Sequence, residues 1–169
     1  MPDLPQAKAF GEDERSVLLG YLDYHRTVLA RKAGGLSEAQ ARIAGCPPSN
    51  LTLLGIIRHM ADVERFWFRM RLVGEDVGQI YASEHNPEGD FEYDDTATLQ
   101  EALATWHAEI AAADANIAGI SVDSYEQADV EGQSVSTLRR VLVHLIEEYA
   151  RHCGHADLLR QAIDGAVND

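Results

Sequence analysis

The sequence predicts an all-α fold, a four-helix bundle with one long crossover loop. Three observations support this prediction. Apolar residues recur three or four positions apart along four long stretches, which is the period of an amphipathic helix. A glycine follows each of these stretches, as is common after a helix C-terminus. No stretch alternates apolar and polar residues for long enough to predict several strands. Four amphipathic helices bury their apolar stripes most simply against one another.

Five helical segments and one long loop are expected. The segments are, in chain order, Glu12–Lys32, a short piece at Ser37–Ile43, Leu51–Val73, Thr96–Ala118 and Ser136–Ile163. Ser49 or Asn50 is expected to cap the second long helix and Thr96 the third, because their side chains can accept a hydrogen bond from a free backbone N–H. The stretch between Gly74 and Asp95 holds glycines, Asn86-Pro87 and several acids. A loop of this length is more often a functional lid than a simple connection.

Length and charge restrict the classes of protein. The 169 residues are enough for one domain, expected over residues 1–169. The chain has 14 basic and 28 acidic residues, so its formal charge is −14. We expect it to repel phosphate backbones and anionic lipids. We therefore expect neither nucleic acid nor a membrane as partner, and no apolar run is long enough to span one.

The N-terminal residues and the cysteines indicate the compartment. No signal peptide is recognisable in the first residues. Two cysteines, Cys46 and Cys153, lie far apart in the sequence and outside any CxxC motif. A disulfide scaffold is therefore not expected, and a reducing cytoplasm is the simplest location.

The last helix carries the clearest signal for chemistry. On a helical wheel Glu148, His152 and His155 lie at about 40°, 80° and 20° from His144, so four groups able to bind metal share one stripe. His144 and His152 are roughly 12 Å apart along the axis, too far to bind one ion comfortably. The pairs His144/Glu148, Glu148/His152 and His152/His155 remain as alternatives.

A third ligand has to come from another helix, and the second long helix offers His59 on a mostly apolar face. Three protein ligands with an open position are typical of a catalytic metal site. The alternative for His59 is a hydrogen-bonded core histidine.

The remaining candidates carry less information. His25, His85 and His107 are expected to be solvated or locally bonded, and Cys153 to be a packed thiol facing away from the stripe. No histidine has an acid three residues before it, which excludes a ferritin-like di-iron site.

Two segments carry a family resemblance. Residues 51–67, LTLLGIIRHMADVERFW, resemble the second helix of the DinB-like (YfiT-like) metal-dependent superfamily, and residues 144–157, HLIEEYARHCGHAD, resemble its last helix. The resemblance implies a small four-helix bundle, often a homodimer, whose metal is held by His59, Glu148 and His152. A glutamate at position 148 is similar to the mycothiol-dependent maleylpyruvate isomerase and related thiol S-transferases. His155 and His144 are then expected beside the metal ligands or at the rim of the site.

The resemblance also implies an activity. We expect a cytoplasmic S-transferase that binds Zn²⁺, with Ni²⁺, Fe²⁺ or Mn²⁺ as alternatives, and activates mycothiol or bacillithiol for addition to a small electrophile. The electrophile is expected in a cleft beneath the loop at 75–95. A hydrolase using metal-bound water and a non-catalytic metal-binding stress protein are the alternatives.

The isomerase has a further C-terminal domain that helps to hold the thiol, so here the bundle is expected to supply the contacts. The available cations are Arg58, Arg69, Arg139 and Arg140. The wheel turns Arg58 and Arg69 away from His59, and none of the four is assigned.

Overall fold

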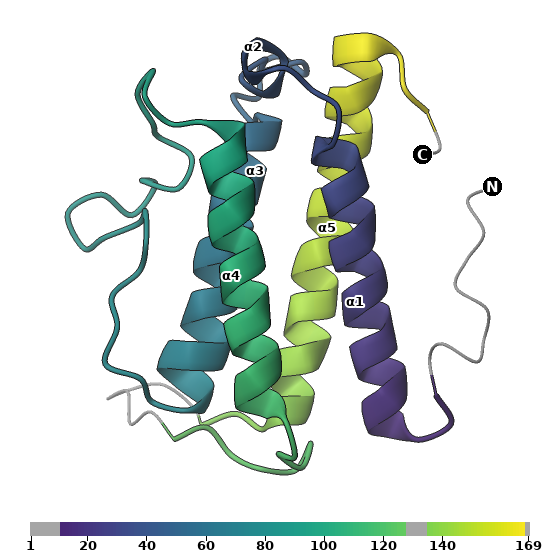
Figure 1. The fold of residues 1–169 in the computed structure, drawn as a ribbon, viewed down its shortest axis with the longest axis vertical. Helices are drawn as coiled ribbons and strands as arrows, with labels where there is room; N and C mark the ends of the chain where they lie inside the picture. The colour runs from purple at the N-terminus through teal and green to yellow at the C-terminus, as the bar shows by residue number, and fades with distance from the viewer. Residues whose placement is uncertain (1–10, 128–134, 168–169) are drawn as a thin grey trace. The chain divides into compact units, whose positions relative to one another are not determined.

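The computed structural model describes residues 11–127 and 135–167, and within these ranges the chain is all-α. The elements, in chain order, are α1 (Glu14–Ala33), α2 (Glu38–Ala41), α3 (Leu53–Glu64), η2 (Arg65–Leu72), α4 (Leu99–Ile117) and α5 (Leu138–Asp164) (Figure 1). Strand pairing in the described residues is limited to one isolated bridge between Tyr125 and Thr137. The predicted all-α bundle class is confirmed. None of the helices in these ranges combines the length and apolar character needed to cross a membrane.

Two compact units are distinguished. The first contains the chain up to Ile56 and again from Leu142 onward, and the second contains Ile57 to Val141. The single domain expected over residues 1–169 stays a prediction.

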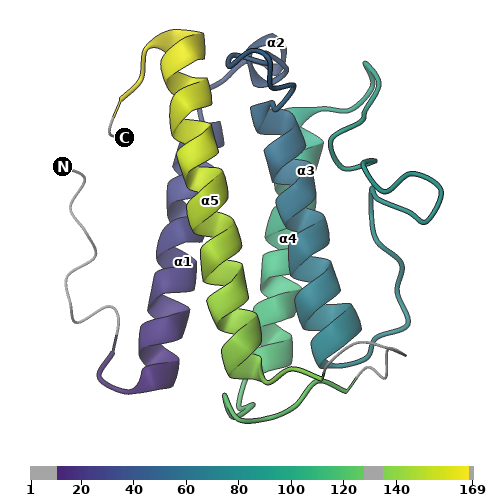
Figure 2. The same cartoon turned by 180° about the vertical axis from the view of Figure 1, so that it is seen from behind.

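The first unit is built on α1 and α5, which lie side by side in Figures 1 and 2. Lys32 of α1 makes an ion pair with Asp157 of α5, with Nζ 2.7 Å from Oδ1. Arg160 Nη1 donates to the backbone carbonyls of Lys32 and Gly34, at 2.7 and 3.1 Å. The buried apolar side chains of this pair include Leu22, Leu29, Leu145, Tyr149 and Ala156. Apolar burial and polar contacts therefore both fix the face of α5 that turns toward α1.

The second unit is built on the later part of α3, η2 and α4. Glu109 of α4 is buried and accepts hydrogen bonds from Arg65 and Arg69 of η2, at 2.5 and 3.1 Å. Trp106 of α4 and Phe68 of η2 are fully buried. A buried carboxylate needs such charge-assisted partners, so these bonds fix how α4 packs on η2.

The helix starts differ from the expected caps at two places. α3 begins at Leu53, and the hydroxyl of Thr52 accepts the N–H of Gly55 at 3.0 Å. Neither Ser49 nor Asn50 is therefore the cap, and Ser49 instead accepts the N–H of Leu51. The first turn of the predicted helix is irregular because the capping hydroxyl sits three residues later than Ser49.

α4 likewise begins at Leu99 with Thr98 as its cap, accepting the N–H of Glu101 at 3.2 Å. Thr96 was the expected cap, but its N–H and hydroxyl both bond to Asp94 in the loop. The last helix starts at Leu138, two residues after the expected Ser136. Gly119 and Gly165 follow the helix ends with positive φ, as the sequence predicts.

The second long helix changes type along its length. The sequence predicts one helix to Val73, and its last helical residue is Leu72, with Val73 as the C-cap before Gly74, whose φ is +69°. From Arg65, however, it is a π-helix, in which each N–H bonds to the carbonyl five residues before it. The helical wheel uses the α-helical period, so its placement of Arg69 relative to His59 does not apply beyond Glu64.

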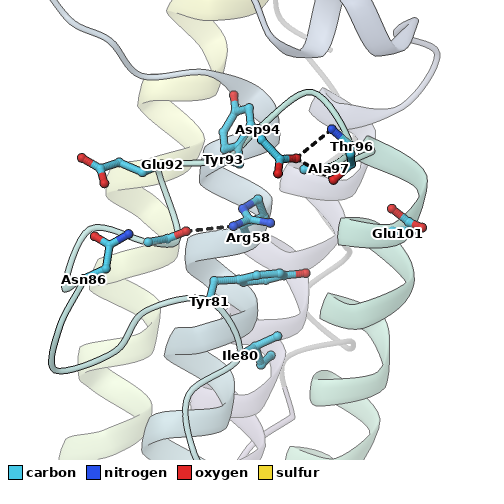
Figure 3. Close-up of a pocket in the computed structure, with 11 residues that line it drawn as sticks. Arg58, Ile80, Tyr81, Asn86, Glu92, Tyr93, Asp94, Thr96, Ala97 and Glu101 are labelled. Atoms are coloured by element: carbon cyan, nitrogen blue, oxygen red, sulfur yellow. Dashed lines mark hydrogen bonds between the residues drawn. The ribbon is translucent and has the colours of Figure 1, made fainter.

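The long loop runs from Gly74 to Thr98 and is irregular, as predicted. It borders an open polar hollow of about 580 Å³ (Figure 3). The lining includes Arg58, Tyr81, Glu92, Tyr93, Asp94 and Glu101. Since His59 is not among the residues that line it, the hollow lies beside Arg58 on α3 and not against the His59 ring.

Candidate functional site

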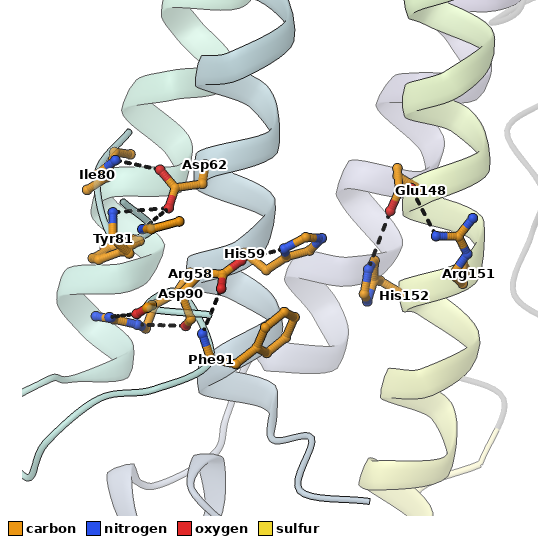
Figure 4. Close-up of polar contacts among 12 residues, drawn as sticks. Arg58, His59, Asp62, Ile80, Tyr81, Asp90, Phe91, Glu148, Arg151 and His152 are labelled. Atoms are coloured by element: carbon orange, nitrogen blue, oxygen red, sulfur yellow. Dashed lines mark hydrogen bonds and ion pairs between the residues drawn. The ribbon is translucent and has the colours of Figure 1, made fainter. Parts of the chain in front are cut away.

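The stripe predicted on the last helix brings Glu148 and His152 together. Nε2 of His152 lies 3.5 Å from Oε2 of Glu148 (Figure 4). Their side chains are only 8% and 12% exposed, respectively. Residues four apart in an α-helix lie one above the other, so the spacing alone directs both groups to one side. An imidazole nitrogen and a carboxylate oxygen this close are able to share one divalent ion.

The stripe continues toward the helix N-terminus. His144 lies 3.9 Å from Glu148 and 3.5 Å from Glu147, measured between ring nitrogens and carboxylate oxygens. One ligand atom from each of these three residues lies within 4.8 Å of the others, so this histidine–glutamate cluster could bind a metal. Arg151 donates to Oε1 of Glu148 at 2.9 Å, so its guanidinium compensates part of the negative charge of that carboxylate.

His155 lies on the other side of His152. The Nδ1 atoms of the two rings are 3.4 Å apart, and the rings meet edge to face with centroids 5.2 Å apart. His155 also lines a small apolar hollow of about 230 Å³ in the first unit. The other lining residues are Cys46, Ser49, Leu51, Leu158 and Leu159.

His59 belongs to α3 in the second unit and has a partner that the sequence analysis missed. Its Nδ1 lies 2.7 Å from Oδ2 of Asp90 in the long loop (Figure 4). Its ring stacks on Phe91, with centroids 4.9 Å apart and planes at 26°. An ionised carboxylate can only accept, so in this contact Nδ1 is the ring nitrogen that donates. A metal-binding histidine commonly has this arrangement.

Asp90 had no sequence signal. It lies 31 residues from His59 in a segment without periodicity, and it is one of several acids in the loop. The burial of its carboxylate distinguishes it from its neighbours, because Glu88 and Glu92 are exposed. Burial of this kind can be read only from the folded chain.

A comparison with protein families identifies the family of the chain. A family model described as mycothiol-S-transferase matches residues 17–165, which is most of the sequence. The chain belongs to the mycothiol-S-transferase family. The match confirms the resemblance to the thiol-transferase type of the DinB-like superfamily and supports a mycothiol S-transferase-like function. The comparison with curated proteins returned no match.

Four arginines were candidates for holding the thiol in this mycothiol-S-transferase family member, and all four have protein partners. Arg58 donates to backbone carbonyls of the loop, and Arg69 binds Glu75 and Glu109. Hydrogen bonding to Glu75 raises the pKa of Arg69 above its usual value. Arg139 pairs with Asp123, and Arg140 donates to Ser136. The thiol would therefore have to share or displace these contacts.

The remaining candidates behave largely as expected. Cys153 is a packed thiol: it is 6% exposed, its Sγ lies 3.5 Å from the carbonyl oxygen of His25, and burial raises its pKa to about 12. His25 is half-buried, and this burial lowers its pKa. His85 and His107 are exposed, and the His107 ring stacks on Trp106. Burial and the raised pKa make Cys153 a poor nucleophile.

Proposed function

We propose that the protein is a metal-dependent S-transferase in which His59, Glu148 and His152 hold one divalent ion. The observation that carries the proposal is the buried Glu148/His152 pair, with its two ligand atoms 3.5 Å apart, in a chain of the mycothiol-S-transferase family. His59 is included because its Nδ1 is bonded to the Asp90 carboxylate, an arrangement common in metal-binding histidines, and because the family resemblance implies that the third ligand is this residue.

The donor set fits a divalent transition metal. Two neutral imidazoles and one carboxylate suit Zn²⁺, and Ni²⁺, Fe²⁺ or Mn²⁺ would also accept them. A metal bound there would lower the pKa of a coordinating thiol, so that the thiolate exists at neutral pH. Only three protein ligands are proposed, which leaves a coordination position for the thiol.

The reaction joins the thiol sulfur to an electrophilic carbon. The S–H proton is lost, the S–C bond forms, and the leaving group departs with its bonding pair. If the electrophile is an activated double bond, the adjacent carbon takes up a proton instead. The electrophile is proposed to bind beneath the long loop, where the acids Glu92 and Asp94 favour a neutral or cationic molecule over an anionic one. We expect the reaction in the cytoplasm, where thiols are kept reduced.

Metal content tests the ligand set. Protein purified without chelator or affinity tag, analysed by mass spectrometry of its metals, should contain close to one ion per chain. His59→Ala and His152→Ala should each lose it, because two remaining ligands hold an ion weakly. His85→Ala is the matched control, since that histidine is exposed in the loop, and it should keep the metal. A metal-free wild type after reconstitution would contradict the proposal.

Thiol consumption tests the reaction. With mycothiol and a chromogenic aryl halide, the wild type should consume thiol and Glu148→Ala should be close to the uncatalysed rate. Equal rates for the two proteins would exclude this mechanism. Metal-dependent hydrolysis of an ester without added thiol would support the alternative in which a metal-bound water reacts.

A further inference from the structure

Two side chains of α3 fasten the long loop to the helix. The first is Asp62, whose carboxylate is buried and accepts three consecutive backbone N–H groups of the loop. The donors are Ile80 at 2.5 Å, Tyr81 at 3.0 Å and Ala82 at 2.9 Å. These bonds fix the first half of the loop (Figure 4).

Arg58, one helical turn before Asp62, fastens the second half. Its Nη2 donates to the carbonyl of Gly89 at 2.8 Å, and its Nε donates to the carbonyl of Asp90 at 3.0 Å. The guanidinium lies 3.8 Å from the centre of the Tyr81 ring and 5.4 Å from that of Tyr93 (Figure 3). Two hydrogen bonds and two ring faces hold a planar guanidinium in one orientation, which a lysine could not reproduce.

Arg58 binds the two peptide groups that flank the Cα of Asp90. The Asp90 backbone accepts from Arg58, while its carboxylate reaches His59, the next residue of the same helix. The second carboxylate oxygen accepts the N–H of Phe91 at 3.0 Å, so the carboxyl plane is fixed as well. A continuous set of contacts therefore runs from Arg58 through the loop backbone and Asp90 to Nδ1 of His59.

We propose that Arg58 is a positioning residue for His59: by holding Gly89 and Asp90, it keeps the Asp90 carboxylate on Nδ1 and so presents Nε2 of His59 as the metal-binding atom. The inference rests on the proposed function for the metal, but the state of the His59 ring can be measured without one. In this proposal the long loop helps to orient the proposed metal ligand His59.

The ring state is tested first, on metal-free protein. Long-range proton–nitrogen NMR at pH 8 should show the wild-type His59 ring with the proton on Nδ1. In Asp90→Asn the amide can donate as well as accept, so the proton should no longer be confined to Nδ1. Arg58→Met should change the same signals, although it leaves Asp90 in place. A loop that only stabilised the fold would leave them unchanged.

Metal affinity is the second readout, measured by zinc competition with a chromogenic chelator. Asp90→Asn should bind zinc about 10- to 100-fold more weakly, the usual cost of losing a partner of a metal ligand. Arg58→Met should weaken binding in the same direction without exceeding that loss, and Arg58→Lys should not restore it. Because Arg58 acts through Asp90, the double variant should be no weaker than Asp90→Asn alone.

The controls distinguish a loss of positioning from the effects of a lost charge or of unfolding. Glu84→Gln removes an exposed acid from the same loop, and Arg139→Met removes a partly exposed arginine that pairs with Asp123. Both should keep the wild-type ring state and affinity, and circular dichroism should show all variants folded. An Arg58→Met protein with the wild-type His59 signals and an affinity within about twofold of wild type would overturn the inference. If the wild type binds no zinc, the proposed function fails, while the NMR comparison still decides the role of Arg58.

Discussion

His152 and Cys153 are neighbours in α5, yet their side chains have opposite surroundings. His152 lies beside Glu148 and His155, whereas the thiol of Cys153 lies against the backbone of His25 in α1. Successive helical residues point about 100° apart, so the helix geometry alone separates a proposed metal ligand from a packed thiol. Burial also raises the pKa of the Cys153 thiol.

This raised pKa predicts a loss of stability in alkaline solution. The thiol titrates near 9.0 when unfolded and near 12 when folded, so between these values the folded chain holds more protons than the unfolded chain. The free energy of unfolding must then fall as pH rises. From pH 8 to pH 10, wild type should lose about 1.4 kcal/mol more than Cys153→Ala in urea unfolding.

Thiol counting provides the control. At pH 8 a disulfide reagent should modify one thiol of the native protein, Cys46, and two after unfolding. Rapid modification of both thiols in the native protein would mean that Cys153 is accessible and would contradict the pH prediction.

At the scale of elements, the long loop depends on a close approach that only glycine allows. A Cβ on Gly89 would lie 2.3 Å from the carbonyl oxygen of Tyr81 and 3.2 Å from that of Asn86. Both are backbone atoms, so the loop itself would have to move. Gly89 precedes Asp90, and any shift there displaces the carboxylate that holds His59.

Gly89→Ala should therefore destabilise the protein by about 1–3 kcal/mol, the usual cost of overpacking. It should also speed hydrogen exchange at the Phe91 amide, which is bonded to Asp90 and Glu88. Gly78→Ala is the matched control in the same loop, because its Cβ would meet nothing within 4 Å. Equal stability of the two variants would show that the loop tolerates the shift.

The elements were predictable to the extent that their signals are local. Periodicity and following glycines predict the helices, and the four-residue spacing predicts the Glu148/His152 pair. The caps were less predictable: Ser49, Asn50 and Thr52 are all able to cap, and only the folded backbone selects Thr52. The π-helix from Arg65 has no distinct apolar pattern in the sequence, and the Asp90 partner of His59 comes from a distant loop.

At the scale of the whole molecule, the proposed ligands come from helices far apart in the sequence. A metal that binds only the folded chain stabilises it by mass action. The homodimer that the family resemblance implies stays a prediction.

Zinc at 100 times its dissociation constant should raise the free energy of unfolding by about 2.7 kcal/mol. Chemical denaturation with and without zinc measures this directly. His59→Ala and His152→Ala should each abolish the gain, and His85→Ala should retain it. A gain that survives in His59→Ala would show that the metal is held by the α5 residues alone, for which the His144, Glu147 and Glu148 cluster is the candidate.

The two anchors of the long loop also affect how this protein can diversify. Asp62 holds residues 80–82 and Arg58 holds Gly89 and Asp90, while residues 83–88 between them are all exposed. Doubling a flexible segment costs only about 0.6 kcal/mol of chain entropy. Insertions and new sequences at 83–88 can thus be accepted while both anchors keep their places. Relatives could acquire different acceptor preferences in this segment and keep the same support for His59.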